Sequence, residues 1–210
     1  MKVKPILFNT EMVRAILDGR KTCTRRVLKW PYEVYAVNGM VVKHKGKNTV
    51  LEYPYLPGDI LYVRETFAWC PCWDCGMDTE QGACTDHIYH SEKKEYGCYM
   101  YRASCEDNEY PSADTWHPSM HMPKEAARIW LKITDVHVER LQDITSEQIR
   151  KEGAEVEEPY ILNGEEKRYA FANLWNSTIK KSDINLYGWD ANPFVWVVEF
   201  ERCERPESEE

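Results

Sequence analysis

The sequence predicts an α+β fold: a small, mostly antiparallel β-barrel with a few short helices and a Cys-rich insertion. Most of the chain consists of short segments that alternate apolar and polar residues, which is typical of strands. Only a few segments have helical spacing. Of its 210 residues 43% are apolar, 8 of them Trp, which is enough to bury one core. We therefore expect a single domain over residues 1–203.

The first helix is expected to begin at Asn9 or Thr10, whose side chains can cap it. Apolar residues follow at helical spacing, and Gly19 stands where a left-handed residue would end the helix. Further along, Asn38 and Gly39 predict a β-hairpin with a two-residue turn, because both central positions of a type I′ turn need positive φ.

Later segments predict three strands and two helices. Residues 60–67 and 129–138 alternate in polarity, and residues 194–200 are apolar on both faces, which indicates a central strand. A helix at 145–153 begins with the Thr-x-x-Gln pattern of a capping box. A second helix at 167–179 has apolar residues along one side.

The segment 70–105 has neither period, and we interpret it as a Cys-rich insertion between two strands of the main sheet. It holds six of the 8 cysteines. The pairs Cys72-x-x-Cys75 and Cys84-x-x-His87 have the ligand types and pair spacing of a structural zinc site. Alternative ligands in the same segment are Cys70, His90 and Cys98. The other interpretation is free thiols, since stable disulfides are rare in a reducing cytoplasm.

The net charge of −8 is unevenly distributed. Residues 19–47 hold eight basic residues and one acid, whereas the tail 204–210 is acidic and is expected to be disordered. A basic site on an acidic body suits a small or confined anionic ligand and argues against long duplex DNA. No apolar run reaches the roughly 18 residues of a membrane helix, and no signal peptide is evident. We expect a cytoplasmic protein with no membrane partner.

The block Gly-Arg-Lys-Thr-Cys-Thr-Arg-Arg at 19–26 carries a family resemblance. It resembles the ASCH motif glycine-x-lysine-x-x-glutamate-x-arginine, with Gly19, Lys21 and Arg26 in register and Thr24 where many members have glutamate. A branch similar to the bacterial acetylcytidine amidohydrolase also has threonine there. The resemblance continues in three further segments: 57–63, 141–145 with Glu152, and 197–200. The chain also looks like ASCH proteins of bacteriophages and prophages.

The resemblance implies a PUA-like barrel, a scaffold associated with RNA and modified nucleotides, in a bacterial or phage-infected cell. It implies hydrolysis of the exocyclic amide of acylated cytidine, with Thr24 as nucleophile, Lys21 as base and Glu152 as acid or base. Arg26 would contact an anion or oxyanion, and the main site would need no cofactor. A threonine hydroxyl needs an adjacent base, and the arginines around Lys21 would favour loss of its proton by like-charge repulsion.

Two alternatives to an enzyme remain. In a binding module for RNA or a nucleotide, Lys21 and Arg26 would hold a phosphate or carbonyl while aromatic side chains stack on a base. The candidate stacking residues are Trp69, Trp116 and Trp189, each of which could instead pack in the core. Arg64 and Glu65 would line the same pocket or form an internal ion pair. The second alternative is an accessory protein of phage assembly.

Overall fold

The computed structural model describes residues 1–29, 32–35, 41–44, 47–50, 54–71, 88–90, 92–105, 115–154 and 165–207. The expected α+β class is confirmed, since antiparallel strands are combined with a few helices. No closed barrel is found among the described residues. The chain forms two compact units. The first unit comprises 1–2, 18–60 and 131–202, and the second comprises 3–17, 61–130 and 203–210.

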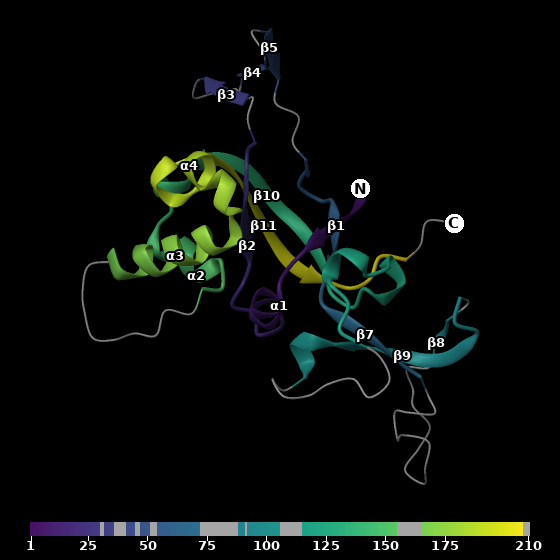
Figure 1. Ribbon diagram of the computed structural model, residues 1–210. Helices are drawn as coiled ribbons and strands as arrows, with labels where there is room; N and C mark the ends of the chain where they lie inside the picture. The colour runs from purple at the N-terminus through teal and green to yellow at the C-terminus, as the bar shows by residue number, and fades with distance from the viewer. Residues whose placement is uncertain are drawn as a thin grey trace. The chain divides into compact units, whose positions relative to one another are not determined.

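Three neighbouring strands form the centre of the first unit, in the order β10 (Trp130–Arg140), β11 (Phe194–Cys203) and β2 (Cys23–Val27). Figure 1 shows them side by side. β11 runs antiparallel to β2, with Val197 opposite Arg25. The strands expected at 129–138 and 194–200 are therefore confirmed.

The antiparallel pairing of the two strands of the expected hairpin is confirmed, whereas its two-residue turn stays a prediction. β3 (Tyr32–Tyr35) pairs antiparallel with β4 (Val41–His44), which pairs with β5 (Lys47–Val50). The turn residues Asn38 and Gly39 lie outside the described residues.

The helices of the first unit are α2 (Ser146–Lys151), α3 (Glu165–Thr178) and α4 (Ile184–Tyr187). The capping box that begins α2 is present as expected: Gln148 N–H donates to Thr145 Oγ1, and Thr145 N–H donates to Gln148 Oε1. A buried cluster joins α2 and α3 to β11. It comprises Leu141, Ile144, Ile149, Phe171, Trp175, Val195 and Val197. This packing fixes the end of α2 beside β2, where the candidate site lies.

The second unit begins with β1 (Val3–Leu7) and α1 (Thr10–Leu17). Asn9 Oδ1 accepts the Met12 N–H at 2.8 Å, so Asn9 caps α1. Gly19 follows α1 with φ +75°, the left-handed conformation that the sequence predicts there. β6 (Ile60–Arg64) neighbours β1, and it ends before the expected strand 60–67 does.

A three-stranded sheet occupies much of the segment interpreted as an insertion. Its order is β7 (Phe67–Pro71), β9 (Glu95–Tyr101) and β8 (Ile88–His90). The segment without clear periodicity at 70–105 thus contains the strands β8 and β9, which were not predicted from the sequence. Gly97 interrupts the alternation because the Trp69 ring packs against it, and a Cβ there would lie 2.4 Å from that ring.

The proposed zinc ligands Cys72, Cys75, Cys84 and His87 lie outside the described residues. Within the described ranges, no group of three or more His, Cys, Asp or Glu could hold a metal ion. The zinc site remains a prediction.

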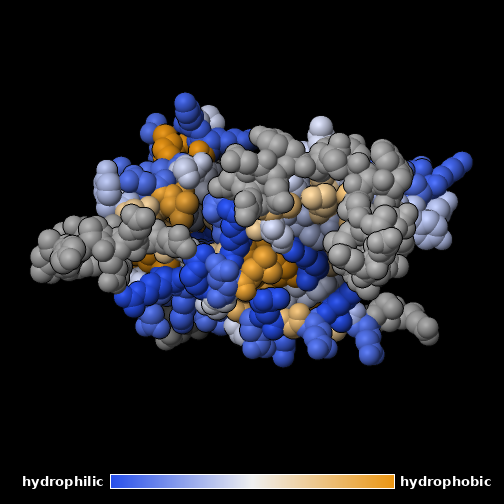
Figure 2. Space-filling view, turned by 90° about the horizontal axis from the view of Figure 1, so that it is seen from below, coloured by the Kyte–Doolittle hydropathy of each residue, from blue (hydrophilic) through white to orange (hydrophobic). Residues whose placement is uncertain are grey.

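Hydrophilic side chains separate small hydrophobic areas on the face drawn in Figure 2. None of the helices in the described ranges is long and apolar enough to cross a membrane.

Candidate functional site

Lys21 is held beside the C-terminal end of α2. The chain leaves α1 through the left-handed Gly19, and Lys21 then forms an isolated antiparallel bridge with Glu152. The next residue, Thr22, donates its N–H to Lys151 O at 2.8 Å. Backbone pairing therefore places the basic block against the residue that ends α2.

The Lys21 side chain is fully buried against Glu152. Lys21 Nζ lies 2.7 Å from Glu152 Oε2 and 2.8 Å from Glu152 O. The exposed fractions of the two side chains are 0% and 7%. A buried charge is tolerated only when it is paired and hydrogen-bonded, and both conditions hold here. Two of the three predicted catalytic residues, 131 positions apart, thus meet in the structure.

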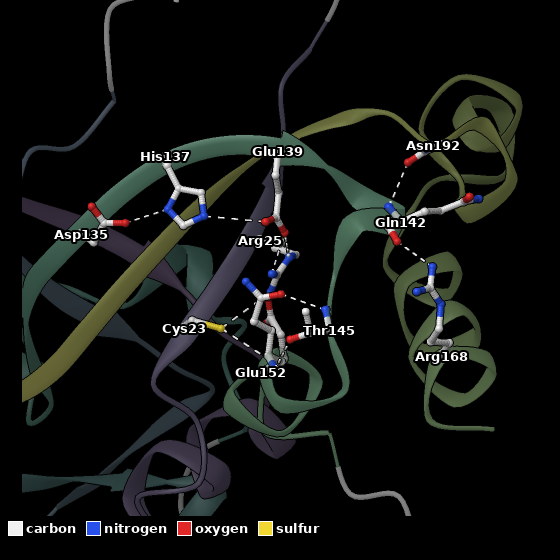
Figure 3. Close-up of polar contacts among 11 residues, drawn as sticks. Cys23, Arg25, Asp135, His137, Glu139, Gln142, Thr145, Glu152, Arg168 and Asn192 are labelled. Carbon is white, nitrogen blue, oxygen red and sulfur yellow. Dashed lines mark hydrogen bonds and ion pairs between the residues drawn. The ribbon is translucent and has the colours of Figure 1, made fainter. Parts of the chain in front are cut away.

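Arg25 extends this pair into a row of charges. Its Nη1 donates to Glu152 Oε1 at 3.0 Å, and its Nε and Nη2 donate to Glu139 Oε1 at 2.8 and 2.6 Å. On the other side of Glu139, His137 Nε2 lies 3.7 Å from Glu139 Oε2, and His137 Nδ1 lies 2.6 Å from Asp135 Oδ2. Figure 3 shows acids and bases alternating from Asp135 to Glu152.

These contacts shift the acid–base equilibria of the row. Burial disfavours charge on Arg25, but Glu152 and Glu139 outweigh it and raise the pKa of Arg25. Burial likewise acts against the Glu139 carboxylate, but the contact with His137 and the charge of Arg25 lower its pKa below the usual 4.5. The contact with Glu139 raises the pKa of His137 above 6.5, and Asp135 adds to the effect. Arg25, Glu139 and His137 are therefore each stabilised in the charged form.

The raised pKa of His137 predicts pH-dependent stability. Protonated His137 stabilises the fold fully below pH 6.5, and this contribution is lost as the pH rises through the folded-state pKa. Because the ring is 38% exposed, we expect a contribution below about 1 kcal/mol. Urea unfolding should show that His137→Asn is destabilising at pH 5.5 and neutral at pH 8. An equal effect at both pH values would contradict the assignment.

Cys23 is buried between Arg25 and α2. Arg25 Nη1 lies 3.7 Å from its sulfur, and the Cys23 thiol points to Gln148 O at 3.9 Å. Burial, with a smaller effect of Glu152, raises the pKa of Cys23 to about 12. A thiol with this pKa is a poor nucleophile near neutral pH, which agrees with the expectation that Cys23 packs inward.

We therefore expect Cys23 to be unreactive in the folded protein. Alkylation with N-ethylmaleimide at pH 7.5, followed by peptide mass spectrometry, should label Cys23 at least about 100-fold more slowly than Cys203, since burial and a high pKa both suppress thiolate attack. Cys203 is only half-buried and serves as the internal comparison. Similar labelling rates would refute this description of Cys23.

Thr24 and Arg26 lie on the other face of β2, because side chains alternate along a strand. Thr24 is 1% exposed and pairs with Val198, and Arg26 pairs with Trp196. No hydrogen bond joins Thr24 to Lys21 in the part of the chain that the structure describes. Burial lowers the pKa of Arg26, and burial also raises the pKa of its neighbour Tyr55.

Four predicted ligand contacts lie in the second unit. Glu65 is 1% exposed, and each of its oxygens accepts a 2.9 Å hydrogen bond from Arg128. The sequence left open whether Glu65 lines a pocket or forms an internal ion pair. Glu65 forms an internal ion pair, and its partner is Arg128. Arg64 Nη2 donates to Met120 O, while Arg64 Nε is buried with no hydrogen-bond partner among the described residues.

The tryptophans have different surroundings. Trp69 is 2% exposed and donates its N–H to Glu95 Oε1 at 2.9 Å. Within the ranges that the structure describes, Trp116 has a buried Nε1 without a hydrogen-bond partner, and Arg102 lies over its ring at 5.7 Å. In the first unit, Trp189 packs against the buried cluster of α2, α3 and β11. This agrees with the alternative that Trp189 packs in the core.

Glu139 and His137 were not among the site residues predicted from the sequence. Their signal is the spacing of Asp135, His137 and Glu139, which alternation places on one face of β10.

Comparison with protein-family models, curated proteins and solved structures finds no match to the chain. The chemistry of the site therefore rests on its own geometry.

Proposed function

We propose that the protein binds a modified pyrimidine nucleoside at β2 and hydrolyses an amide on its exocyclic amine. The observation that carries this proposal is the buried contact of Lys21 Nζ with Glu152 Oε2 at 2.7 Å. A buried ammonium hydrogen-bonded to a carboxylate is suited to acid–base chemistry in a site that limits water.

Amide hydrolysis needs such a pair because an amine is a poor leaving group. Water supplies a hydroxyl group to the acyl carbon and a proton to the amine nitrogen, so that a carboxylic acid and cytidine leave. Thr24 is the proposed nucleophile: its oxygen would bond to the acyl carbon as the C–N bond breaks, and its hydroxyl proton would pass by way of Lys21 and Glu152 to the amine nitrogen, so that cytidine leaves. Water would then hydrolyse the acyl-Thr24 ester, which releases the carboxylic acid and restores the Thr24 hydroxyl. Arg26 would stabilise negative charge on the acyl oxygen.

We further propose that the fold is an ASCH-type, PUA-like fold. The supporting observation is that Lys21, from the motif-like block 19–26, touches Glu152, which follows another matching segment. A shared fold does not transfer an activity by itself, so the enzymatic proposal depends on the chemistry of these residues.

The test is the release of cytidine from a panel of cytidines carrying acetyl, propionyl or benzoyl groups on the exocyclic amine, followed by chromatography. We expect release by the wild type and by Thr22→Val, in which the control residue is an exposed threonine two positions before Thr24. Thr24→Val should abolish release, whereas Thr24→Ser should retain part of it. No release from any acyl group by folded wild-type protein would overturn the proposed hydrolysis.

A second candidate is a non-catalytic nucleoside or RNA-binding module. One observation favours it: Thr24 makes no hydrogen bond to Lys21 within the described residues, so the predicted nucleophile and base are not in contact. A binding module predicts that Thr24→Val changes the Kd little, while Arg26→Ala weakens binding and reduces its salt dependence. Calorimetry with the same nucleosides distinguishes the two functions.

A further inference from the structure

The second unit contains a pocket that the proposed function does not use. Its volume is about 490 Å³, within the range of small-molecule sites. The wall includes Trp69 and Tyr99, which pair across β7 and β9, and the carboxylates Glu92 and Glu125. Aromatic surface thus meets negative charge in one cavity.

Trp69 is arranged to attract a cation. Its N–H donates to the Glu95 carboxylate at 2.9 Å, which increases the electron density of the ring face. Tyr99 and His90 contact the indole in edge-to-face geometry, with centroids 5.2 and 5.0 Å away. The ammonium of Lys93 lies over the ring, 5.9 Å from its centroid. The protein's own side chain thereby shows that an ammonium fits against this ring.

Carboxylates outnumber lysines among the described residues at this pocket. Glu92 and Glu125 line it and Glu95 accepts from the Trp69 N–H, whereas Lys93 is the lysine in the wall, which also includes His90, His117 and His121. Tyr99 donates its hydroxyl to Glu125 Oε1 at 3.0 Å, and burial together with this hydrogen bond raises the pKa of Tyr99. Tyr99 therefore stays protonated, and Glu125 Oε2 makes no further hydrogen bond to the described residues.

We propose that this pocket binds a small organic ammonium ion with an apolar body, of the arylalkylamine class. The ammonium would lie against the Trp69 face and pair with Glu92 and Glu125, while the apolar body contacts the aromatic wall. Lys93 is then an internal competitor for the same position. This proposal is independent of amide hydrolysis in the first unit.

The test compares three probes of similar shape, namely benzylamine, benzyl alcohol and benzoate. Binding to the full chain is measured by calorimetry at pH 8, above the range in which free imidazoles gain a proton. We expect benzylamine to bind about tenfold more tightly than benzyl alcohol, and benzoate not to bind. Equal binding of the amine and the alcohol, or tighter binding of benzoate, would overturn the proposal.

Variants at exposed positions locate the site without disturbing the core. Glu125→Gln and Glu92→Gln should each weaken benzylamine binding by about threefold, whereas the exposed control Glu204→Gln should not. Lys93→Gln should strengthen binding, because it removes the competing ammonium, and Lys94→Gln should leave it unchanged. Benzylamine binding that none of the pocket variants alters would place the amine elsewhere and contradict the proposed site.

Discussion

Glu152→Gln is expected to lower the free energy of unfolding by about 3–5 kcal/mol, the range for breaking a buried ion pair. The Glu152 carboxylate accepts from both Lys21 and Arg25, and a neutral amide would leave these two buried cations with less compensation. Arg25 keeps Glu139, whereas Lys21 loses the carboxylate that contacts its ammonium. Urea unfolding at pH 7 measures the change.

Two further variants serve as controls for the effect of Glu152→Gln on stability. Glu147→Gln, on the same helix and 79% exposed, should change stability by no more than about 0.5 kcal/mol. The double variant Lys21→Met/Glu152→Gln should be more stable than Glu152→Gln alone, because it also removes a buried cation. A loss below about 1 kcal/mol for Glu152→Gln would mean that the pair is not buried as described.

The second large effect concerns turnover and rests on the proposed function. Lys21→Met should lower kcat for an acylated cytidine by about 10²–10⁴, the usual contribution of a positioned acid or base. KM should change much less, because the proton is needed in the transition state rather than for binding. Steady-state kinetics with the acetyl compound measures both constants.

The control for this prediction is Lys151→Met, whose ammonium is 42% exposed on α2. Lys21→Met leaves Glu152 paired with Arg25, so the fold should persist, and circular dichroism checks this. Unchanged kcat in folded Lys21→Met protein would remove the lysine from the chemistry. An increase in KM with constant kcat would instead assign it to binding.

Local signals predicted much of the fold. The Asn9 cap, the left-handed Gly19 and the capping box of Thr145 and Gln148 depend on neighbours within a few residues, and all three are present. The strand β9 was missed because Gly97 breaks the side-chain alternation. Residue 97 is a glycine because the Trp69 ring packs against it, and sequence periodicity gives no information on such a tertiary contact.

The site was predictable only in part. The motifs that resemble the ASCH family predicted Lys21 and Glu152 as site residues, and these two side chains are in contact in the structure. The partnership of Arg25 with Glu139, 114 positions away, depends on the order of β10, β11 and β2, and no local pattern sets that order. Thr24 and Lys21 were predicted to be in contact because they are only three residues apart in the sequence. Side chains alternate along a strand, however, and this places Thr24 on the other face of β2.

The central claim is amide hydrolysis, and the most direct measurement is the product balance of the wild-type protein with N-acetylated cytidine. Amide hydrolysis predicts that cytidine and acetate appear in equal amounts and that both disappear with Lys21→Met. Binding of the nucleoside without formation of either product would contradict hydrolysis and leave the binding module as the function of the site.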